Sequence, residues 1–311
     1  MSPGQFFLEF RKYLELFNFL KKLFKNNQRK DIQVGKLELS IPASDLSLRK
    51  SSFSGGKLQV ASCQSIGVER PHNEDTVFTL TTLLNDIQSP QSIGIFIVAD
   101  GMGGHQSGEV ASCLAIKAVS QMLIDQALKR VFFNNETLSE EFCKKSLKRA
   151  IDEAQANVQR HVPGGGTTLT MVLSINDMFF FAHVGDSRLY HLDLEGRINL
   201  ITKDHSLVKR LVDLGEITER EAATHPQRNV LYKALGQSDP FQPDIGTINV
   251  EVGERLLICS DGLWGALDDE IIEIMMQKMP NLNQLASDLV GAANDAGGPD
   301  NISVVLVERL S

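Results

Sequence analysis

Apolar segments that end abruptly at an acidic residue are the feature of this 311-residue sequence that most constrains its fold. The run Ile95–Ala99 is followed by Asp100, by glycines at positions 101, 103 and 104, and by His105. A run of this length and composition predicts a strand that is buried on both faces. Glycines tolerate backbone angles that other residues resist and let the chain approach a ligand closely. Asp100 therefore either opens an ordinary Asp-Gly turn or supplies oxygen ligands to a hard divalent cation.

The same pattern recurs at four other corners of the chain, where an acid stands at the predicted beginning or end of a strand. Each corner alone is a common turn, but grouped carboxylates repel one another unless cations offset their charge. Oxygen-only ligands select magnesium, manganese or calcium over zinc or copper. Two such ions would lower the pKa of a shared water and make it a nucleophile toward phosphorus. The four corners lie in Arg70–Asp75, Phe179–Arg188, Arg255–Gly262 and Gly297–Asn301.

Together these motifs resemble, in their order, the metal-dependent Ser/Thr protein phosphatases of type 2C, also called PPM, in the form found in bacteria. The resemblance covers about residues 58–309, which is nearly the whole body of the chain. The matching motifs are Arg70…Asn73-Glu74-Asp75, Asp100-Gly101-Met102-Gly103-Gly104-His105, Gly166-Thr167-Thr168, Gly185-Asp186-Ser187-Arg188, Ser260-Asp261-Gly262-Leu263 and Asp300-Asn301.

This resemblance implies an α+β fold, a four-layer αββα sandwich of two antiparallel sheets flanked by helix pairs, with a metal cleft at one edge. It implies a phosphoprotein phosphatase that hydrolyses phosphoserine and phosphothreonine by direct attack of a hydroxide bound to two metal ions, opposing a Ser/Thr kinase in signalling. The implied cofactors are two Mn²⁺ or Mg²⁺ ions per site, with a third, weaker ion in bacterial relatives. The implied partners are phosphorylated proteins and a cognate kinase.

The family pattern also assigns the ligands of the first ion. Asp100 would bridge the two ions, and the backbone carbonyl of Gly101 would bind one of them. Asp261 and Asp300 would hold the first ion directly. Because all of these residues are present, a catalytically dead relative is not expected.

Further roles follow from the same resemblance. An acid of the Glu74–Asp75 pair would serve the second ion, and the choice between Glu74 and Asp75 stays open. Asp186 would help to bind the third ion. Arg70 would bind phosphate oxygens, for which a bidentate guanidinium is suited. His105 would be the general acid that protonates the leaving oxygen.

Residues 204–236 match the mobile flap beside the cleft, which influences substrate choice in the family. His205, at the entrance of this segment, is expected to be structural rather than catalytic. Trp264 is expected to pack beneath the loop that carries Asp261.

Elsewhere, strands and helices come in blocks rather than in strict alternation, which favours an α+β layered domain. Gln59–Ser65 and Asp75–Thr82 are predicted as paired strands, and four later strands with short turns as an antiparallel meander. The four strands of the meander are Thr167–Ser174, Met178–Val184, Arg188–Leu192 and Ile198–Thr202. The other predicted strands are Gly94–Ala99, Asn249–Val252, Arg255–Ser260 and Ile302–Arg309. The predicted helices are Gly108–Leu128, Ser139–His161, Ser206–Leu214, Thr218–Thr224, Asp268–Lys278 and Leu282–Gly291.

The N-terminal segment lies outside the family pattern. Residues 5–25 predict a helix with a wide, Phe-rich face, and basic residues continue to position 30. Such a helix suits a membrane interface, a partner protein, or packing against its own domain. Residues 31–57 predict a linker, so we expect an N-terminal helix and linker at 1–57 and a catalytic domain at 58–311.

Charge distribution and cysteine content indicate what the protein binds and where it is located. The first 50 residues carry a net +5 within a total of −8, so the other 261 residues carry −13, which argues against nucleic-acid binding. Charges interrupt the N-terminal apolar residues, so neither a signal peptide nor a spanning helix is expected. Four widely spaced cysteines indicate a reducing compartment. We therefore expect a cytoplasmic protein, or a peripheral one if residues 5–30 bind a membrane.

Two alternative functions remain. A non-catalytic module could keep the metal site to recognise phosphorylated partners, although the intact set of acids speaks against it. Alternatively, the enzyme could hydrolyse small phosphoesters instead of phosphoproteins. A turnover assay distinguishes the non-catalytic module from a phosphatase. A comparison of peptide with small-molecule substrates distinguishes an enzyme for small phosphoesters from a phosphoprotein phosphatase.

Overall fold

The chain divides into two units, Met1–Ala43 and Ser44–Ser311. A computed structural model describes part of the second unit, namely residues 49–55, 57–84, 91–103, 106–134, 136–237 and 242–310. The helix predicted at residues 5–25 and the histidine at position 105 lie outside the described residues. No helix in the described ranges has the length and apolar character needed to cross a membrane.

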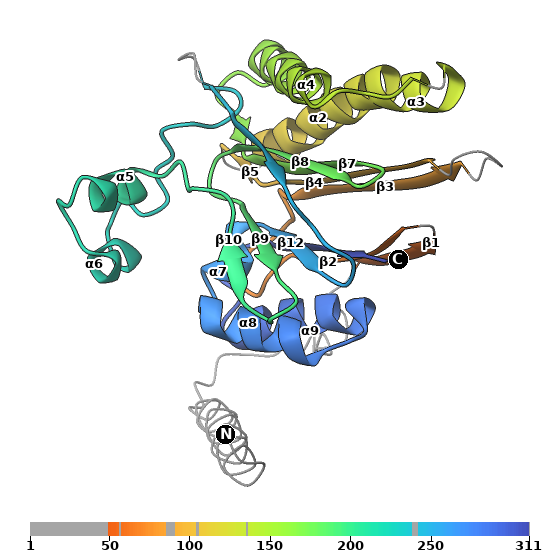
Figure 1. The fold of residues 1–311 in the computed structure, drawn as a ribbon. Coiled ribbons are helices and arrows are strands. Elements are labelled where there is room, and N and C mark those ends of the chain that lie inside the picture. The colour runs from red at the N-terminus through yellow and green to blue at the C-terminus, as the bar shows by residue number, and fades with distance from the viewer. Residues whose placement is uncertain are drawn as a thin grey trace, which may run out of the picture. The chain divides into compact units, whose positions relative to one another are not determined.

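Two antiparallel sheets form the centre of the second unit (Figure 1). The six-stranded sheet has the order β1 (Arg49–Gly55), β2 (Leu58–Ser65), β13 (Ile302–Arg309), β12 (Arg255–Cys259), β9 (Arg188–Leu192) and β10 (Ile198–Leu200). The five-stranded sheet has the order β11 (Asp244–Ile248), β8 (Met178–Val184), β7 (Leu169–Ile175), β4 (Gln91–Ala99) and β3 (Thr76–Leu84). A short pair, β5 (Gly101–Met102) and β6 (Gly166–Thr167), follows the end of β4.

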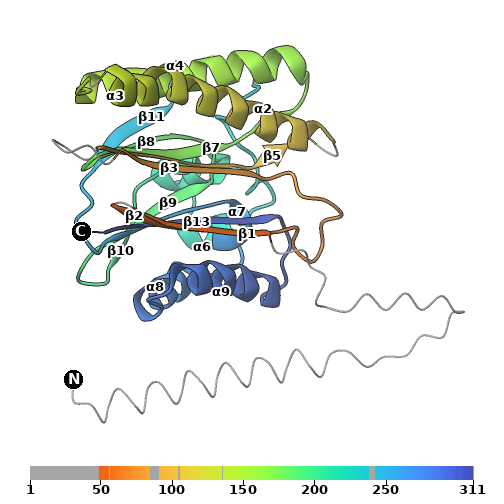
Figure 2. The same cartoon turned by 90° about the vertical axis from the view of Figure 1, so that its right-hand side faces the viewer.

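Helices cover the outer face of each sheet (Figure 2). On the five-stranded sheet lie α2 (Gln106–Leu123), the π-helical turn η1 (Ile124–Leu128), α3 (Lys129–Asn134) and α4 (Glu140–His161). The helix predicted at 108–128 is therefore longer and contains a π-helical turn, a feature that usually occurs as one turn within an α-helix. On the six-stranded sheet lie α8 (Asp269–Lys278) and α9 (Leu282–Asp295), while α5 (Leu207–Asp213), α6 (Glu219–Ala223) and α7 (Asp261–Trp264) lie at the edge.

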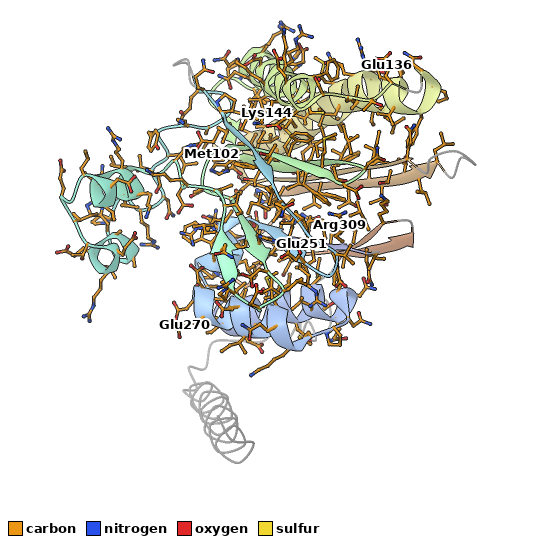
Figure 3. The ribbon with its side chains drawn as sticks, viewed as in Figure 1. Met102, Glu136, Lys144, Glu251, Glu270 and Arg309 are labelled. Carbon is orange, nitrogen blue, oxygen red and sulfur yellow. The ribbon has the colours of Figure 1, made fainter. Side chains whose placement is uncertain are left out.

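Three separate apolar clusters fill the spaces between these four layers. Along β4, Ile95 and Ile97 pack toward α2 and α4, whereas Phe96 and Val98 pack toward the other sheet. Successive side chains of a strand point to opposite faces, so a strand buried on both faces must be apolar throughout. Side chains also fill the space between the sheets in Figure 3. The predicted αββα sandwich and the buried strand before Asp100 are confirmed.

Two predicted strand arrangements were wrong. The strands predicted at 59–65 and 75–82 do not pair, because β2 pairs with β1 and β13 while β3 pairs with β4. The predicted four-strand meander is split, with β7 and β8 in one sheet and β9 and β10 in the other. The chain crosses between the sheets at Gly185, whose φ of 111° lies in the region that glycine tolerates. Burial patterns identify the faces of a strand but not its partners.

Two segment predictions also differ from the structure. Residues 49–55, predicted as linker, form β1, and the boundary predicted between residues 57 and 58 falls inside the β1–β2 hairpin. The strand predicted at 249–252 is wrong, because the strand in this region is β11 at Asp244–Ile248. Both observed strands lie at the edge of a sheet. Backbone pairing with one neighbour creates them, and their side chains carry little of the apolar pattern that marks an inner strand.

Candidate active site

A cavity of ≈ 620 Å³ lies at the edge of the sandwich where β4, β8 and β12 end. Met102, one of its lining residues, is labelled in Figure 3 on the side from which α5 and α6 project. Seven of the residues singled out in the sequence line this cavity, although they come from five separate corners of the chain. They are Arg70, Glu74, Asp100, Gly101, Asp186, Asp261 and Asp300.

The Gly166-Thr167-Thr168 motif holds the backbone of Asp100. The Asp100 N–H donates to Thr168 Oγ1 at 3.0 Å. The Asp100 carbonyl accepts from the Thr168 N–H and from Thr167 Oγ1, each at 2.8 Å. Both backbone groups of Asp100 are therefore used in holding the strand end, which leaves its carboxylate to face the cavity.

Glycine is required at two positions where the start of α2 packs against this corner. A Cβ atom on Gly101 would lie 2.2 Å from the carbonyl oxygen of Gly108 and 2.6 Å from that of Glu74. A Cβ atom on Gly108 would lie 2.1 Å from Glu74 Oε2. Glu74 is held in the same place by its backbone, since its carbonyl accepts from Ser112 Oγ at 2.6 Å. The close packing therefore places the Glu74 side chain beside the Asp100 corner.

Asp75 is buried and does not line the cavity. Its Oδ2 accepts from Ser260 Oγ at 2.8 Å and from Ser303 Oγ at 2.7 Å. Its Oδ1 is buried without a hydrogen-bond partner among the described residues, and the same holds for Asp261 Oδ1. Buried polar atoms nearly always have a partner, so these two oxygens are suited to a cation.

Burial and concentrated negative charge raise the pKa values of the acids at this site. For Asp75, burial together with the charges of Asp261 and Asp300 outweighs the opposing hydrogen bonds from the two serine hydroxyls, and the pKa rises to about 7. Burial and the neighbouring Asp300 raise the pKa of Asp261 to about 6. Burial and the surrounding carboxylates also raise the pKa of Asp100 and of Asp186 well above their ordinary values. A bound cation would relieve this repulsion.

These residues fit hard cations that retain water, not a closed cage of side chains. The described part of the chain contains no group of three His, Cys, Asp or Glu side chains gathered around one point. Magnesium, however, usually keeps several waters and is bound through one or two carboxylates. The acidic side chains at the cavity offer oxygen donors, and among the described residues Asp261 Oδ1 and the nearby Asp75 Oδ1 are buried without a hydrogen-bond partner. The chemistry of the donor set therefore matches Mg²⁺ or Mn²⁺.

Asn301 lines the cavity and has a role that its motif, Asp300-Asn301, did not predict. Its Oδ1 accepts from the Glu74 N–H at 2.8 Å. Its Nδ2 donates to the carbonyls of Ile66 and His72 at 2.7 and 2.9 Å. Asn301 thereby holds the 66–74 segment against the end that carries Asp300. All three partners are backbone groups, so no other side chain in the sequence signals this role.

The two residues predicted to act on phosphate differ in what the structure shows. Arg70 lines the cavity with a side chain that is 47% exposed, and its Nη2 donates to Asp300 Oδ2 at 2.6 Å. Its guanidinium therefore lies beside the acids and within reach of solvent. His105 lies outside the described residues, and its general-acid role stays a prediction.

The corner at Asp186 is held by His205. The Gly185 backbone N–H donates to the ring Nδ1 of His205 at 3.1 Å. In return, the backbone N–H of His205 donates to the Gly185 carbonyl at 2.7 Å. His205 is buried and stacks on His183 with ring centroids 4.8 Å apart. The predicted structural role of His205 agrees with these contacts.

The sequence profile of the family described as Protein phosphatase 2C matches residues 82–299. The chain belongs to the protein phosphatase 2C family. Protein phosphatase PhpP of Streptococcus pneumoniae is 34% identical over 251 residues, which are 80% of this chain and 97% of that protein. Serine/threonine protein phosphatase PstP of Mycobacterium tuberculosis is 35% identical over 251 residues, which are 81% of this chain and 45% of that protein. A crystal structure of the PstP catalytic domain with two manganese ions has a TM-score of 0.66 and 31% identity, and it covers 82% of this chain and 99% of that one.

In this protein phosphatase 2C chain, the flap segment contributes directly to the cavity. Asn229 and Leu231 line the cavity, and the α5 and α6 helices that precede them project from the edge of the sandwich (Figure 1). The family resemblance predicted a flap at residues 204–236 but singled out neither of these two residues as part of the cavity. Neither residue belongs to a motif, so only the folded chain shows that they face the acids.

Proposed function

We propose that this protein is a metal-dependent serine/threonine phosphatase that acts on phosphorylated proteins and that the acidic cavity is its active site. The observation that supports this most strongly is the convergence of acids from five distant corners, together with two buried carboxylate oxygens that have no hydrogen-bond partner in the described part of the chain. Membership of the phosphatase 2C family supports the same activity. The cofactors are two Mn²⁺ or Mg²⁺ ions, as in the manganese complex of PstP.

Within this proposal, the acids divide the work of holding the ions. Asp100 would be a ligand to both ions, and the Gly101 carbonyl would be a ligand to one of them. Asp261 and Asp300 would hold the first ion. An acid of the Glu74–Asp75 pair would serve the second ion, and Asp186 would contribute to a third, weaker site. Ions bound at these residues would supply a water of lowered pKa as a nucleophile toward phosphorus near neutral pH.

The remaining proposed roles belong to residues that bind the phosphate and move a proton. Arg70 lines the cavity and is exposed enough to turn toward a phosphate, which its guanidinium binds bidentately. Its ion pair with Asp300 holds it beside the acids until substrate arrives. His105 donates a proton to the leaving serine or threonine oxygen, as proposed from the sequence.

The function is tested with the full chain and a phosphothreonine peptide. We expect hydrolysis only when Mn²⁺ or Mg²⁺ is present, because the proposed nucleophile is a water that needs the bound ions to lower its pKa. Chelation should stop the reaction and added metal should restore it. A parallel assay with a small aryl phosphate distinguishes a phosphoprotein phosphatase from an enzyme for small phosphoesters. Turnover that survives complete chelation would contradict the proposal.

Acidity should control how much Mn²⁺ stabilises the fold. Because the pKa of Asp75 is raised from 3.8 to about 7 in the folded protein, the folded state binds more protons than the unfolded chain between these values. The metal-free protein therefore loses stability as pH rises through this window. Since Mn²⁺ binds ionised carboxylates, its effect on the melting temperature should be larger at pH 7.5 than at pH 5.5. Equal shifts at both pH values would show that the acids do not bind the ion.

We also propose a division of labour along the chain. The catalytic domain comprises residues 58–311 together with β1, which pairs with β2 along its whole length. The helix predicted at residues 5–25, with its wide apolar face and the basic residues that continue to position 30, would attach the protein peripherally to an anionic membrane surface. A cytoplasmic location, expected from the cysteine pattern, and regulation opposite a cognate Ser/Thr kinase belong to the same proposal.

Removing residues 1–43, which leaves β1 in place, tests the N-terminal part of this proposal. The full chain should sediment with vesicles that contain anionic lipid, and the shortened chain should remain in solution with unchanged turnover. Neutral vesicles are the control, because the basic residues gain nothing from them. A change in oligomeric state instead would identify a protein partner, and no change in either would favour packing of the helix on its own domain.

A further inference from the structure

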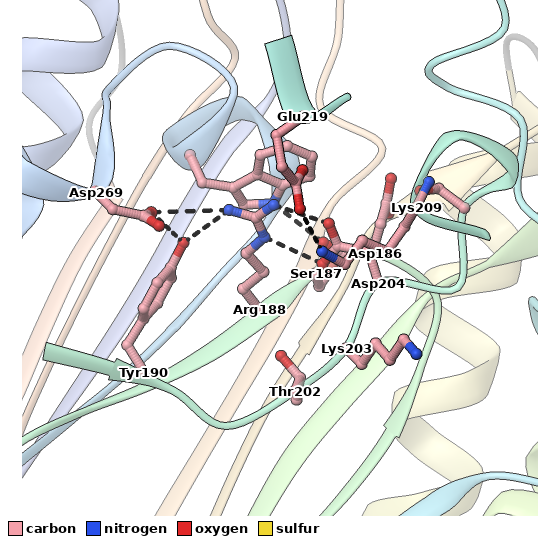
Figure 4. A network of polar contacts seen from close by, with 12 residues as sticks. Asp186, Ser187, Arg188, Tyr190, Thr202, Lys203, Asp204, Lys209, Glu219 and Asp269 are labelled. Atoms are coloured by element: carbon pink, nitrogen blue, oxygen red, sulfur yellow. Dashed lines mark hydrogen bonds and ion pairs between the residues drawn. The ribbon is translucent and has the colours of Figure 1, made fainter. Parts of the chain in front are cut away.

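Arg188 stands at the start of β9, two residues after Asp186, and makes a network of contacts that the proposed mechanism does not use (Figure 4). Its Nε and Nη2 donate to Oδ1 and Oδ2 of Asp204 at 3.0 and 2.8 Å. Its Nη1 donates to Tyr190 Oη at 3.1 Å, and that hydroxyl donates to Asp269 Oδ1 at 2.8 Å. The planar fork of an arginine is needed for this arrangement, which a lysine cannot reproduce.

Trp264 connects Arg188 to the acidic cavity. The guanidinium carbon of Arg188 lies 3.8 Å from the centroid of the Trp264 ring, in a cation–π contact. The indole Nε1–H donates to the backbone carbonyl of Asp186 at 3.0 Å. Trp264 is also the last residue of α7, which begins at Asp261. One indole therefore joins the corners that carry Asp186 and Asp261, and Arg188 covers one of its faces.

Asp204, the acid that accepts two hydrogen bonds from Arg188, lies at the base of the flap. Asp204 is buried and immediately precedes His205, which is hydrogen bonded to Gly185. Ser206 then caps the N-terminus of α5 through the Lys209 N–H. Arg188 thus holds together the crossing between the sheets, the first turn after β12 and the start of the flap. Its side chain is only 17% exposed, and it does not line the cavity.

We propose that Arg188 is a positioning residue: by clamping Asp204 and stacking on Trp264, it sets the Asp186 and Asp261 corners relative to the base of the flap. The inference rests on the proposed function of the cavity, because it concerns how well these corners bind divalent ions. Because Arg188 does not line the cavity, the proposal gives it no direct contact with ions or substrate. Its loss should weaken ion binding and loosen the flap base while the sandwich stays folded.

The test compares Arg188→Lys with Arg255→Lys in the full chain. Arg255 is a matched control, because it is also poorly exposed and bonded to an acid, Glu308, and to carbonyls at the end of α8. It lies at the opposite end of β12, where Arg255 pairs with Leu192 and Cys259 pairs with Arg188. Titration with Mn²⁺ alone should show an affinity about 10-fold weaker in Arg188→Lys, by analogy with residues that orient metal ligands. The Arg255→Lys protein should match the wild type.

Two further readouts separate positioning from a general loss of structure. Trp264 is the only tryptophan in the chain, so its single indole N–H signal in a nitrogen-resolved NMR spectrum reports directly on this contact. That signal should move in Arg188→Lys and stay in place in Arg255→Lys. Turnover of a phosphothreonine peptide by Arg188→Lys should recover at high Mn²⁺ concentration, since weakened ion binding is its main defect.

A double-mutant cycle tests whether Arg188 acts through the indole. Trp264→Phe keeps an aromatic face for stacking but loses the donor to the Asp186 carbonyl. If Arg188 works through that hydrogen bond, Arg188→Lys should weaken Mn²⁺ binding less than about 3-fold in the Trp264→Phe background, because residues in one network are not additive. Unchanged Mn²⁺ affinity in Arg188→Lys, or fully additive effects, would overturn the inference. Failure of the wild-type protein to bind Mn²⁺ would instead overturn the proposed function.

Discussion

Replacing Asp100 by asparagine is expected to lower kcat/KM toward a phosphothreonine peptide by on the order of 10³-fold, the scale of losing a central electrostatic group in an active site. Asparagine has nearly the same shape, but it lacks the charge needed to bridge two cations. Burial raises the pKa of this carboxylate, and so do the charges of the neighbouring Asp75, Asp186, Asp261 and Asp300. Steady-state kinetics over a series of Mn²⁺ concentrations measures the effect.

The same substitution should have an opposite effect on the metal-free fold. At neutral pH a buried carboxylate with a raised pKa opposes folding, so its removal should raise the melting temperature of the chelated protein. Added Mn²⁺ should then stabilise the variant less than the wild type. Asp177→Asn is the matched control, because Asp177 accepts from Lys57 and Arg309 and does not line the cavity. Equal loss of activity in both variants, or full activity in Asp100→Asn, would refute the bridging role.

Replacing Asn301 by alanine is expected to reduce both stability and activity. The change leaves the Glu74 N–H and the carbonyls of Ile66 and His72 without their partner. Each unsatisfied buried group costs about 1–3 kcal/mol, and partial hydration would leave a total of about 3 kcal/mol. Denaturant unfolding monitored by circular dichroism measures this loss of unfolding free energy.

The effect of Asn301 on activity follows from the segment that it holds. Arg70, Glu74 and Asp75 all lie in or beside the tethered loop, so their loosening should lower kcat/KM by about 10- to 100-fold, as for residues that orient metal ligands. Asn281→Ala is a matched control, since Asn281 caps α9 through the Gln284 N–H. Loss of that cap should cost about 1 kcal/mol with unchanged kcat/KM. An Asn301→Ala enzyme of normal activity would show that the loop keeps its position without this tether.

The Asp100→Asn and Asn301→Ala variants should respond differently to excess Mn²⁺. Asp100→Asn removes a group that the ions need, so excess Mn²⁺ should not restore its activity. Asn301→Ala displaces groups that remain chemically intact, and excess Mn²⁺ should restore part of its activity by stabilising the folded arrangement. A comparison of both variants at low and high Mn²⁺ therefore separates a lost ligand from a misplaced one.

Much of the fold could be predicted because its signals are local. The apolar run before Asp100 predicted a strand buried on both faces, and β4 indeed packs Ile95 toward the helices and Phe96 toward the other sheet. Helix boundaries were also accurate where a cap is present, as at Ser139 before α4 and Thr218 before α6. Capping and periodicity depend on residues a few positions apart, so a single sequence contains them.

The partners of the strands could not be predicted in the same way. The strands around Gln59 and Asp75 are neighbours in the chain but lie in different sheets. Likewise, β8 and β9 are separated by three residues yet belong to different sheets, because the chain turns at Gly185. A pattern of alternate burial is the same whichever strand lies alongside, so the choice of partner depends on how the layers close around a common core.

The amino-acid order was enough to predict which residues would carry the chemistry, because each acid stands next to a strand end that its own neighbours define. How those acids are held became visible only in the folded chain. It places Asp75 behind the cavity on two serine hydroxyls, ties the Arg70 segment to Asn301, and joins Asp186 to Trp264 and Arg188. The physical reason is that these supports are hydrogen bonds and ring contacts between residues far apart in the chain, often to backbone groups. Such contacts leave no pattern in the order of the amino acids.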